Sequence, residues 1–239
     1  MLEEHALTSL SAFAMLGLGL VFGLKHATEA DHIVAISSIV SHQRSLLRSV
    51  TVGALWGIGH TASLILVGII VLALRVAVPE RVGNWLEFGV ALMIIGLGAS
   101  ALLRVRAGRR RDIHLHQHKH DGVSHIHLHF HEHGTAHKGA VSTHSHAVSR
   151  IGFKPLLVGA MHGLAGSATL TLLVLTQMNS TALGLLYLAV FGLGSITGML
   201  LMSGLIGLPF ALSARRFGGV HYGLQAVAGA VSVAFGRLV

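Results

Sequence analysis

The chain has 239 residues, of which 52% are hydrophobic and only 11% are charged. A soluble globular chain carries about 25% charged residues, so this composition excludes that class and predicts an integral membrane protein in contact with lipid. The formal charge of +8 is concentrated, because nine of the 17 basic residues lie between Arg104 and Lys154. Such a bias sets membrane orientation, and we expect no nucleic-acid partner. The absence of cysteine excludes disulfides and thiolate metal sites.

Apolar runs of about 20 residues predict six transmembrane helices, three on each side of a hydrophilic loop. Pro209 suits the end of the fifth helix. The predicted spans cover 8–40, 51–76, 85–103, 153–178, 183–209 and 221–238. The fold class is therefore an all-α integral membrane protein. Its expected divisions are a first membrane repeat (1–103), a flexible cytoplasmic loop (104–152) and a second membrane repeat (153–239).

The first span contains a polar string, His26-Ala27-Thr28-Glu29-Ala30-Asp31-His32. Each ionisable side chain at bilayer depth costs roughly 2.5–3.5 kcal/mol, so these groups must face one another, water or an ion. Imidazole and carboxylate without thiolate suit a borderline divalent transition metal. On a regular helix Asp31 would lie about 140° from His26 and His32 about 120° from it on the other side. We therefore expect a broken helix here, or ligands from other helices. A polar string at the membrane surface is the plainer alternative.

The two halves of the chain repeat one another weakly. Gly23-Leu24-Lys25-His26 matches Gly159-Ala160-Met161-His162 at an offset of 136, and Trp56–His60 matches Phe191–Ser195 at 135. A third match places Leu86 and Gly98 over Leu224 and Gly236, at 138. An odd number of spans per repeat gives the halves opposite orientations, as in many secondary transporters. Chance similarity between glycine-rich apolar segments is the alternative.

Two histidines in other spans are candidate partners for the string. His60 lies near the middle of the second span, and we predict it as a metal ligand. His162 takes the place of His26 in the second half without a following carboxylate, so we assign it to the transport path with Glu29 and Thr61. A lone histidine in an apolar helix is more often a packing residue, and that interpretation stays open for both.

The central loop carries 12 of the 19 histidines, between His114 and His146. Low-complexity histidine tracts usually stay disordered and bind metals loosely, although the alternation with apolar residues could also form a short strand. A pH sensor is a further possibility. We predict an auxiliary metal-binding loop, with Zn²⁺ among its ions. Its candidate ligands are His114, His116, His118, His120, His125, His127, His129, His131 and His133.

The string resembles the H-x-x-x-x-D-H signature of the nickel/cobalt transporter family, here His26, Asp31 and His32. Ile58-Gly59-His60-Thr61 is similar to a second family element, L-G-H-[SDT]-T. The resemblance covers nearly the whole chain and implies metal uptake through these residues. Longer members have an additional helix before the signature and an acidic F-D-T-A-T-E element, where this chain reads His162–Ser167. The chain thus looks like a shorter, six-helix-type member.

We accordingly predict a non-enzymatic secondary transporter that imports Ni²⁺ or Co²⁺ through an intramembrane His/Asp site. We expect no prosthetic group, and a cytoplasmic metallochaperone is a possible partner. The loop is expected in the cytoplasm, both termini outside, and the protein in the cytoplasmic (inner) membrane. The alternatives are an exporter with a metal-collecting loop and a non-transporting sensor or chaperone-docking protein. The oligomeric state is not predicted.

Overall fold

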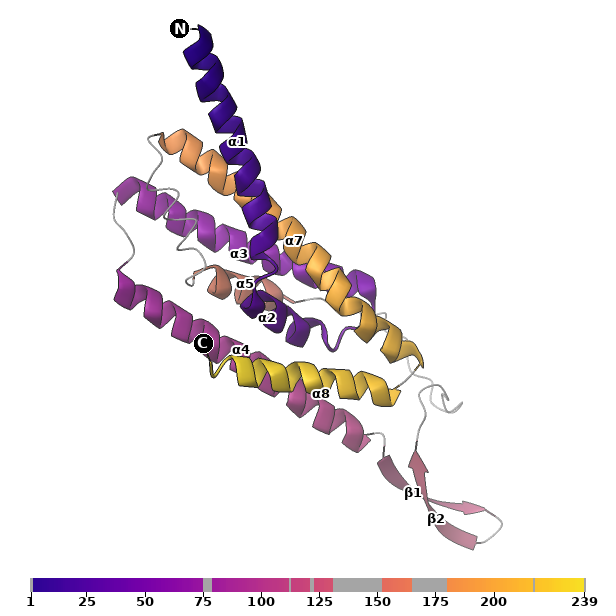
Figure 1. The fold of residues 1–239 in the computed structure, drawn as a ribbon. Helices are drawn as coiled ribbons and strands as arrows, with labels where there is room; N and C mark the ends of the chain where they lie inside the picture. Colours follow the sequence, from indigo (N-terminus) through magenta and orange to yellow (C-terminus); the bar gives the residue numbers. More distant parts are fainter. Residues whose placement is uncertain are drawn as a thin grey trace.

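The computed structural model describes residues 2–74, 79–111, 113–120, 123–130, 152–164, 180–216 and 218–238. Over these residues the chain forms seven helices and one two-stranded sheet (Figure 1). The helices are α1 (Leu2–His26), α2 (Ala30–Val40), α3 (Leu46–Leu74), α4 (Glu80–Arg111), α5 (Lys154–Gly163), α7 (Thr181–Arg216) and α8 (Gly218–Phe235), and the strands are β1 (Ile113–His120) and β2 (Val123–Phe130).

The helices confirm an all-α membrane protein. Three of them contain segments long and apolar enough to cross a bilayer, Leu46–Val71, Glu80–Ala107 and Thr181–Ala214. Shorter apolar stretches lie in α1, α2 and α8. Large apolar side chains such as Phe13, Trp85 and Leu103 are exposed along these helices, as expected of surfaces that face lipid rather than water.

The first predicted span is broken inside the polar string. α1 ends at His26, where Thr28 and Glu29 donate backbone N–H bonds to the carbonyls of Lys25 and His26. Glu29 is extended, with φ −65° and ψ 150°, and precedes α2. The break separates His26 from Asp31 and His32, so the three no longer follow the angular spacing of one helix. The expectation of a broken helix is confirmed.

Two predicted boundaries are wrong. α4 does not end at residue 103 but continues to Arg111, because arginines are good helix formers and cations stabilise a helix C-terminus. Pro209 does not end α7, which runs on to Arg216. Proline removes one backbone donor, but packing holds the helix beyond it, since Phe210 and Ala211 are buried.

The histidine-rich segment follows the strand alternative over residues 113–130. β1 and β2 pair antiparallel, with His114 opposite His129, His116 opposite His127 and His118 opposite His125. The hairpin extends from the C-terminal end of α4 (Figure 1). His131 and His133 lie outside the described residues, as does the second part of the predicted span 153–178 from residue 165 on.

The helix packing repeats at the offsets seen in the sequence. α1 packs against α7 as α5 packs against α3. Gly23 approaches the Phe191 carbonyl while Gly159 approaches that of Trp56, and Gly98 approaches Gly229 while Gly236 approaches Ala91. If each residue is replaced by its equivalent in the other half, each contact becomes the second contact of its pair. The two halves are therefore related by an approximate two-fold axis.

The same contacts give the helix directions. On α3 and α7, Gly53 approaches Ser203 and Gly192 approaches Thr61, so the two helices run antiparallel. α4 and α8 also run antiparallel, by the Gly98 and Gly236 contacts. Equivalent helices of the two halves therefore point in opposite directions, as inverted repeats require.

Candidate metal centre

Three helix ends and one helix centre bring the predicted residues together. His26 lies in the last turn of α1, Asp31 in the first turn of α2, and His162 in the last turn of α5. The C-terminal end of a helix carries partial negative charge and favours cations, whereas the N-terminal end favours a carboxylate. The backbone thus suits a cation beside the two histidines and an ionised Asp31. His60 reaches the same region from within α3.

His26 and His60 face one another through their Nε2 atoms, which lie 3.0 Å apart. Without metal, one of these two nitrogens carries a proton and donates a hydrogen bond, and the other accepts that bond. Two nitrogens at about 2.1 Å from one ion, at right angles, lie about 3.0 Å apart (2.1 × √2). The spacing therefore suits a hydrogen bond and also two adjacent ligands of an octahedral or square-planar ion. His26 Nδ1 also lies 3.1 Å from the carboxylate of Glu29.

Asp31 accepts hydrogen bonds from two imidazoles, one at each oxygen. His32 Nδ1 lies 3.0 Å from Oδ1, and His162 Nε2 lies 2.8 Å from Oδ2. Such carboxylate–histidine contacts fix the tautomer and the orientation of a metal-binding ring. With its Nδ1 proton donated to Asp31, His32 presents a lone pair at Nε2.

Potential ligand atoms form two overlapping groups, each with all atoms within 4.8 Å of one another. One group is His26, His32 and His60; the other is Asp31, His32 and His162. His32 belongs to both. The four imidazoles are buried, and His32 and His60 have no exposed surface. The five residues of the two groups thus form one polar cluster.

Several nitrogens of the cluster lack a partner within the described part of the chain. They are His32 Nε2, His60 Nδ1 and His162 Nδ1. Leaving a buried polar atom unpaired costs about 1–3 kcal/mol, and each such atom in a native structure calls for an explanation. For His32, an ion bound at Nε2 supplies one.

Two aromatic residues form walls of the cluster, although in the sequence they served only to mark the repeat. The Trp56 ring centroid lies 5.4 Å from that of His32 and 5.6 Å from that of His162. Phe191 lies 5.6 Å from His26. Trp56 and Phe191 are equivalent at offset 135, so each half places an aromatic ring against the histidine of the other half. That equivalence, combined with the His26/His162 match, could have predicted the pairing.

The remaining candidates occupy different places. Thr61 is buried beside His60 and donates a hydrogen bond to the Gly192 carbonyl at 3.3 Å. The Glu29 side chain is 43% exposed and lies beside the buried His26. The described histidines of the loop belong to β1 and β2, at the end of α4 away from the chain's N-terminus (Figure 1).

The fold and the cluster define a multi-pass membrane protein with a buried imidazole–carboxylate centre suited to a divalent transition metal. Residues 12–217 match the family model NicO, high-affinity nickel-transport protein. The chain therefore belongs to this nickel-transport family, which is a transporter family and not an enzyme family.

The chain is similar to several known proteins over different shares of its length. The urease accessory protein UreH of Bacillus sp. (strain TB-90) is 35% identical over 238 residues, which cover 93% of this chain and 89% of the relative. A high-affinity nickel transport protein of Cupriavidus necator is 33% identical over 93 residues, 37% of this chain and 24% of the relative. The Arabidopsis thaliana chloroplast protein FOR GROWTH AND FERTILITY 1 is 27% identical, covering 76% of this chain and 46% of the relative. No solved structure matches.

Proposed function

We propose that this chain imports Ni²⁺ through the buried cluster, with His26, His32, His60 and Asp31 as its metal ligands. The observation that carries the proposal is the convergence of three imidazoles within ligand distance of one another in a protein of the nickel-transport family. The three imidazoles come from α1, α2 and α3, and Asp31 lies in the second group, which shares His32 with the first. Asp31 reduces the net charge of a bound dication from +2 to +1, which lowers its cost at bilayer depth.

His162, Thr61 and Glu29 line the path in this proposal. His162 holds the second oxygen of Asp31, and Thr61 anchors α3 to α7 beside His60. Glu29 is the more exposed carboxylate and would attract a cation toward His26. The ion approaches at Glu29 and is transferred to the histidines inside.

The membrane potential is sufficient to drive uptake. Two charges that cross 100 mV release about 4.6 kcal/mol, from roughly 2.3 kcal/mol per charge. This equals roughly 2,000-fold accumulation, at 1.4 kcal/mol per factor of ten. The sequence contains no G-x-x-x-x-G-K-[ST] motif, the P-loop that cradles nucleotide phosphates. Co²⁺ would enter through the same ligands, since selectivity among these metals depends on geometry and supply.

The orientation that we propose places the basic ends of the helices in the cytoplasm, in the cytoplasmic membrane. Arg48 at the start of α3 and Arg104 near the end of α4 line one cavity with Lys154 at the start of α5. One relative is named a urease accessory protein, and a supply of metal to an intracellular enzyme favours import. The alternatives are the exporter and the sensor, which the experiment below separates.

We also propose that the segment 104–152 is an auxiliary division between two membrane repeats, 1–103 and 153–239. Its histidines would collect Ni²⁺ or Zn²⁺ at the cytoplasmic side, before transfer to a metallochaperone. Because such a tract binds loosely, deletion of residues 114–146 should lower uptake more at scarce metal than at plentiful metal.

The test is ⁶³Ni accumulation in cells that lack their own nickel uptake system and express the full chain. Wild type should raise cell nickel, while His26→Ala, Asp31→Ala and His32→Ala at equal protein level should leave it at background. Ser37→Ala is the matched control, because among the described residues its hydroxyl bonds to the Val34 carbonyl of its own helix and to nothing in the cluster. A fall in cell nickel would establish export instead, and no change would favour a sensor.

A further inference from the structure

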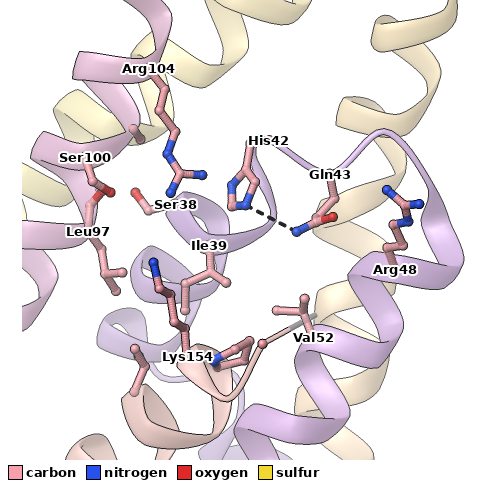
Figure 2. Close-up of a pocket in the computed structure, with 14 residues that line it drawn as sticks. Ser38, Ile39, His42, Gln43, Arg48, Val52, Leu97, Ser100, Arg104 and Lys154 are labelled. Carbon is pink, nitrogen blue, oxygen red and sulfur yellow. Dashed lines mark hydrogen bonds between the residues drawn. The ribbon is translucent and has the colours of Figure 1, made fainter. Parts of the chain in front are cut away.

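A cavity of about 310 Å³ lies at the loop end of the helices, apart from the metal centre. The C-terminal end of α2, the start of α3, the end of α4 and the start of α5 enclose it. In Figure 2 the Arg104 side chain reaches in from α4 and Lys154 from α5, with the Ser38 hydroxyl between α2 and α4. His42 faces Arg104 across the upper part of the cavity (Figure 2).

The charge of this cavity is unbalanced. Its lining holds Arg48, Arg104 and Lys154 and no acidic residue. Within the described residues none of these three cations forms an ion pair. Clefts lined by one sign of charge concentrate the opposite ion, and the like charges repel one another until such an ion neutralises them. A bare metal dication is therefore excluded as the ligand, and an anion is favoured.

The neutral lining groups also suit an anion. Gln43 has an amide group on the cavity wall, with its Nε2 3.3 Å from His42 Nε2, whereas the Ser38 and Ser100 hydroxyls bond to Ser232 and to the Leu97 carbonyl. Partial burial of the ring, followed by the positive charge of Arg104, lowers the pKa of His42 to about 4. His42 is therefore neutral at pH 7 and adds hydrogen-bonding capacity without charge.

We propose that this cavity binds a phosphate group, held by the Arg104 guanidinium and the Lys154 ammonium with support from Arg48. Guanidinium groups match phosphate oxygens in bidentate geometry, and lysine binds them as a point charge. The volume is at the small end of ligand pockets, roughly 300–1,000 Å³, so it fits one phosphate and its immediate substituent rather than a nucleotide. Basic pockets between membrane helices on the cytoplasmic side also hold lipid headgroups.

Free inorganic phosphate and the phosphodiester of an anionic lipid share this chemistry, and the experiment separates them. The full chain is placed in phosphatidylcholine nanodiscs, with and without phosphatidylglycerol, and thermal unfolding is followed with added inorganic phosphate or with chloride of equal ionic strength. A ligand at ten times its dissociation constant should raise the unfolding midpoint by about 3–5 °C. Equilibrium dialysis with radiolabelled phosphate counts the bound ions.

The test variant is Arg104→Gln with Lys154→Gln, and the control is Arg81→Gln with Arg237→Gln. The control removes the same amount of charge at the other end of α4 and near the C-terminus, away from the cavity. Arg104→Lys with Lys154→Arg preserves charge and should still respond, which guards against a folding defect in the test variant.

If inorganic phosphate raises the unfolding midpoint of wild type and of the control variant but not of the test variant, the cavity is a free-phosphate site. If phosphatidylglycerol raises the unfolding midpoint of wild type and of the control variant but not of the test variant, the cavity is a lipid headgroup site. The proposal is overturned if neither phosphate nor phosphatidylglycerol raises the midpoint. It is also overturned if the test and control variants respond alike, because the effect is then general surface charge.

Discussion

Asp31 organises the metal centre because each of its oxygens holds a different imidazole. His32 is its neighbour in α2, but His162 comes from the other half of the chain, 131 positions away. The carboxylate therefore joins the halves at the cluster. The break before α2 makes this possible, since it frees Asp31 from the regular helix that contains His26.

His162→Ala should raise the nickel concentration that gives half-maximal uptake by about 10–100-fold, the usual cost of losing a group that orients a metal ligand. The reason is that Asp31 Oδ2 loses its 2.8 Å partner. His162→Gln supplies an amide donor and should recover most of the affinity. Initial ⁶³Ni uptake rates over a range of nickel concentrations measure both. A glutamine variant as defective as alanine would make His162 a metal ligand rather than a positioning residue.

Much of this centre could be predicted from residue types and spacing. The polar string identified His26, Asp31 and His32, and the repeat offset pointed to His162 as the counterpart of His26. The hydrogen bond between His162 and Asp31 could not be predicted, because it depends on how closely α5 approaches α2. Trp56 and Phe191 were missed as walls because their equivalence at offset 135 was read only as a mark of the repeat and was not combined with the His26/His162 match.

At the scale of the elements, glycine governs how closely helices pack around the centre. A Cβ at Gly23 would overlap the Phe191 carbonyl of α7, only three residues before His26. Small residues let membrane helices approach backbone to backbone. Gly17 in the same helix has nothing within 4 Å of the corresponding position, so its absent side chain serves no such contact.

Gly23→Ala should lower the thermal unfolding midpoint and abolish most uptake, because overpacking costs about 1–3 kcal/mol and separates α1 from α7. Gly17→Ala should be neutral or slightly stabilising, since alanine favours a helix by up to about 1 kcal/mol over glycine. Unfolding in detergent and ⁶³Ni uptake compare the two. Equal behaviour of the variants would show that the close approach at Gly23 is not needed.

Element boundaries were less predictable than element types. Hydropathy detects only residues at bilayer depth, so it missed the arginine-rich last turns of α4 beyond residue 103. Pro209 appeared as a stop because proline removes a backbone donor, but burial of the residues after it keeps α7 helical. Local helix propensity extends α4, and tertiary packing extends α7; hydropathy reports neither effect.

At the scale of the whole molecule, the antiparallel pairs α3/α7 and α4/α8 constrain the orientation of every end. α3 begins beside the end of α7, because Ser49 contacts Gly207. Thr181, at the start of α7, consequently lies at the opposite end from the turn before α3. One membrane side therefore carries Arg44 and Arg48, and the other carries Thr181. If basic residues stay inside, the turn with Arg44 is cytoplasmic.

Single-cysteine labelling tests this orientation cleanly, because the chain contains no cysteine of its own. Arg44→Cys and Thr181→Cys both introduce thiols at exposed positions, on opposite sides of the molecule. In intact cells a membrane-impermeant maleimide should label Thr181→Cys at once and Arg44→Cys only after permeabilisation. The reverse pattern would invert the proposed topology and remove the argument that the histidine-rich loop meets cytoplasmic metal. Labelling of both variants in intact cells would contradict an antiparallel arrangement that spans the bilayer, whereas the unaltered chain should stay unlabelled throughout.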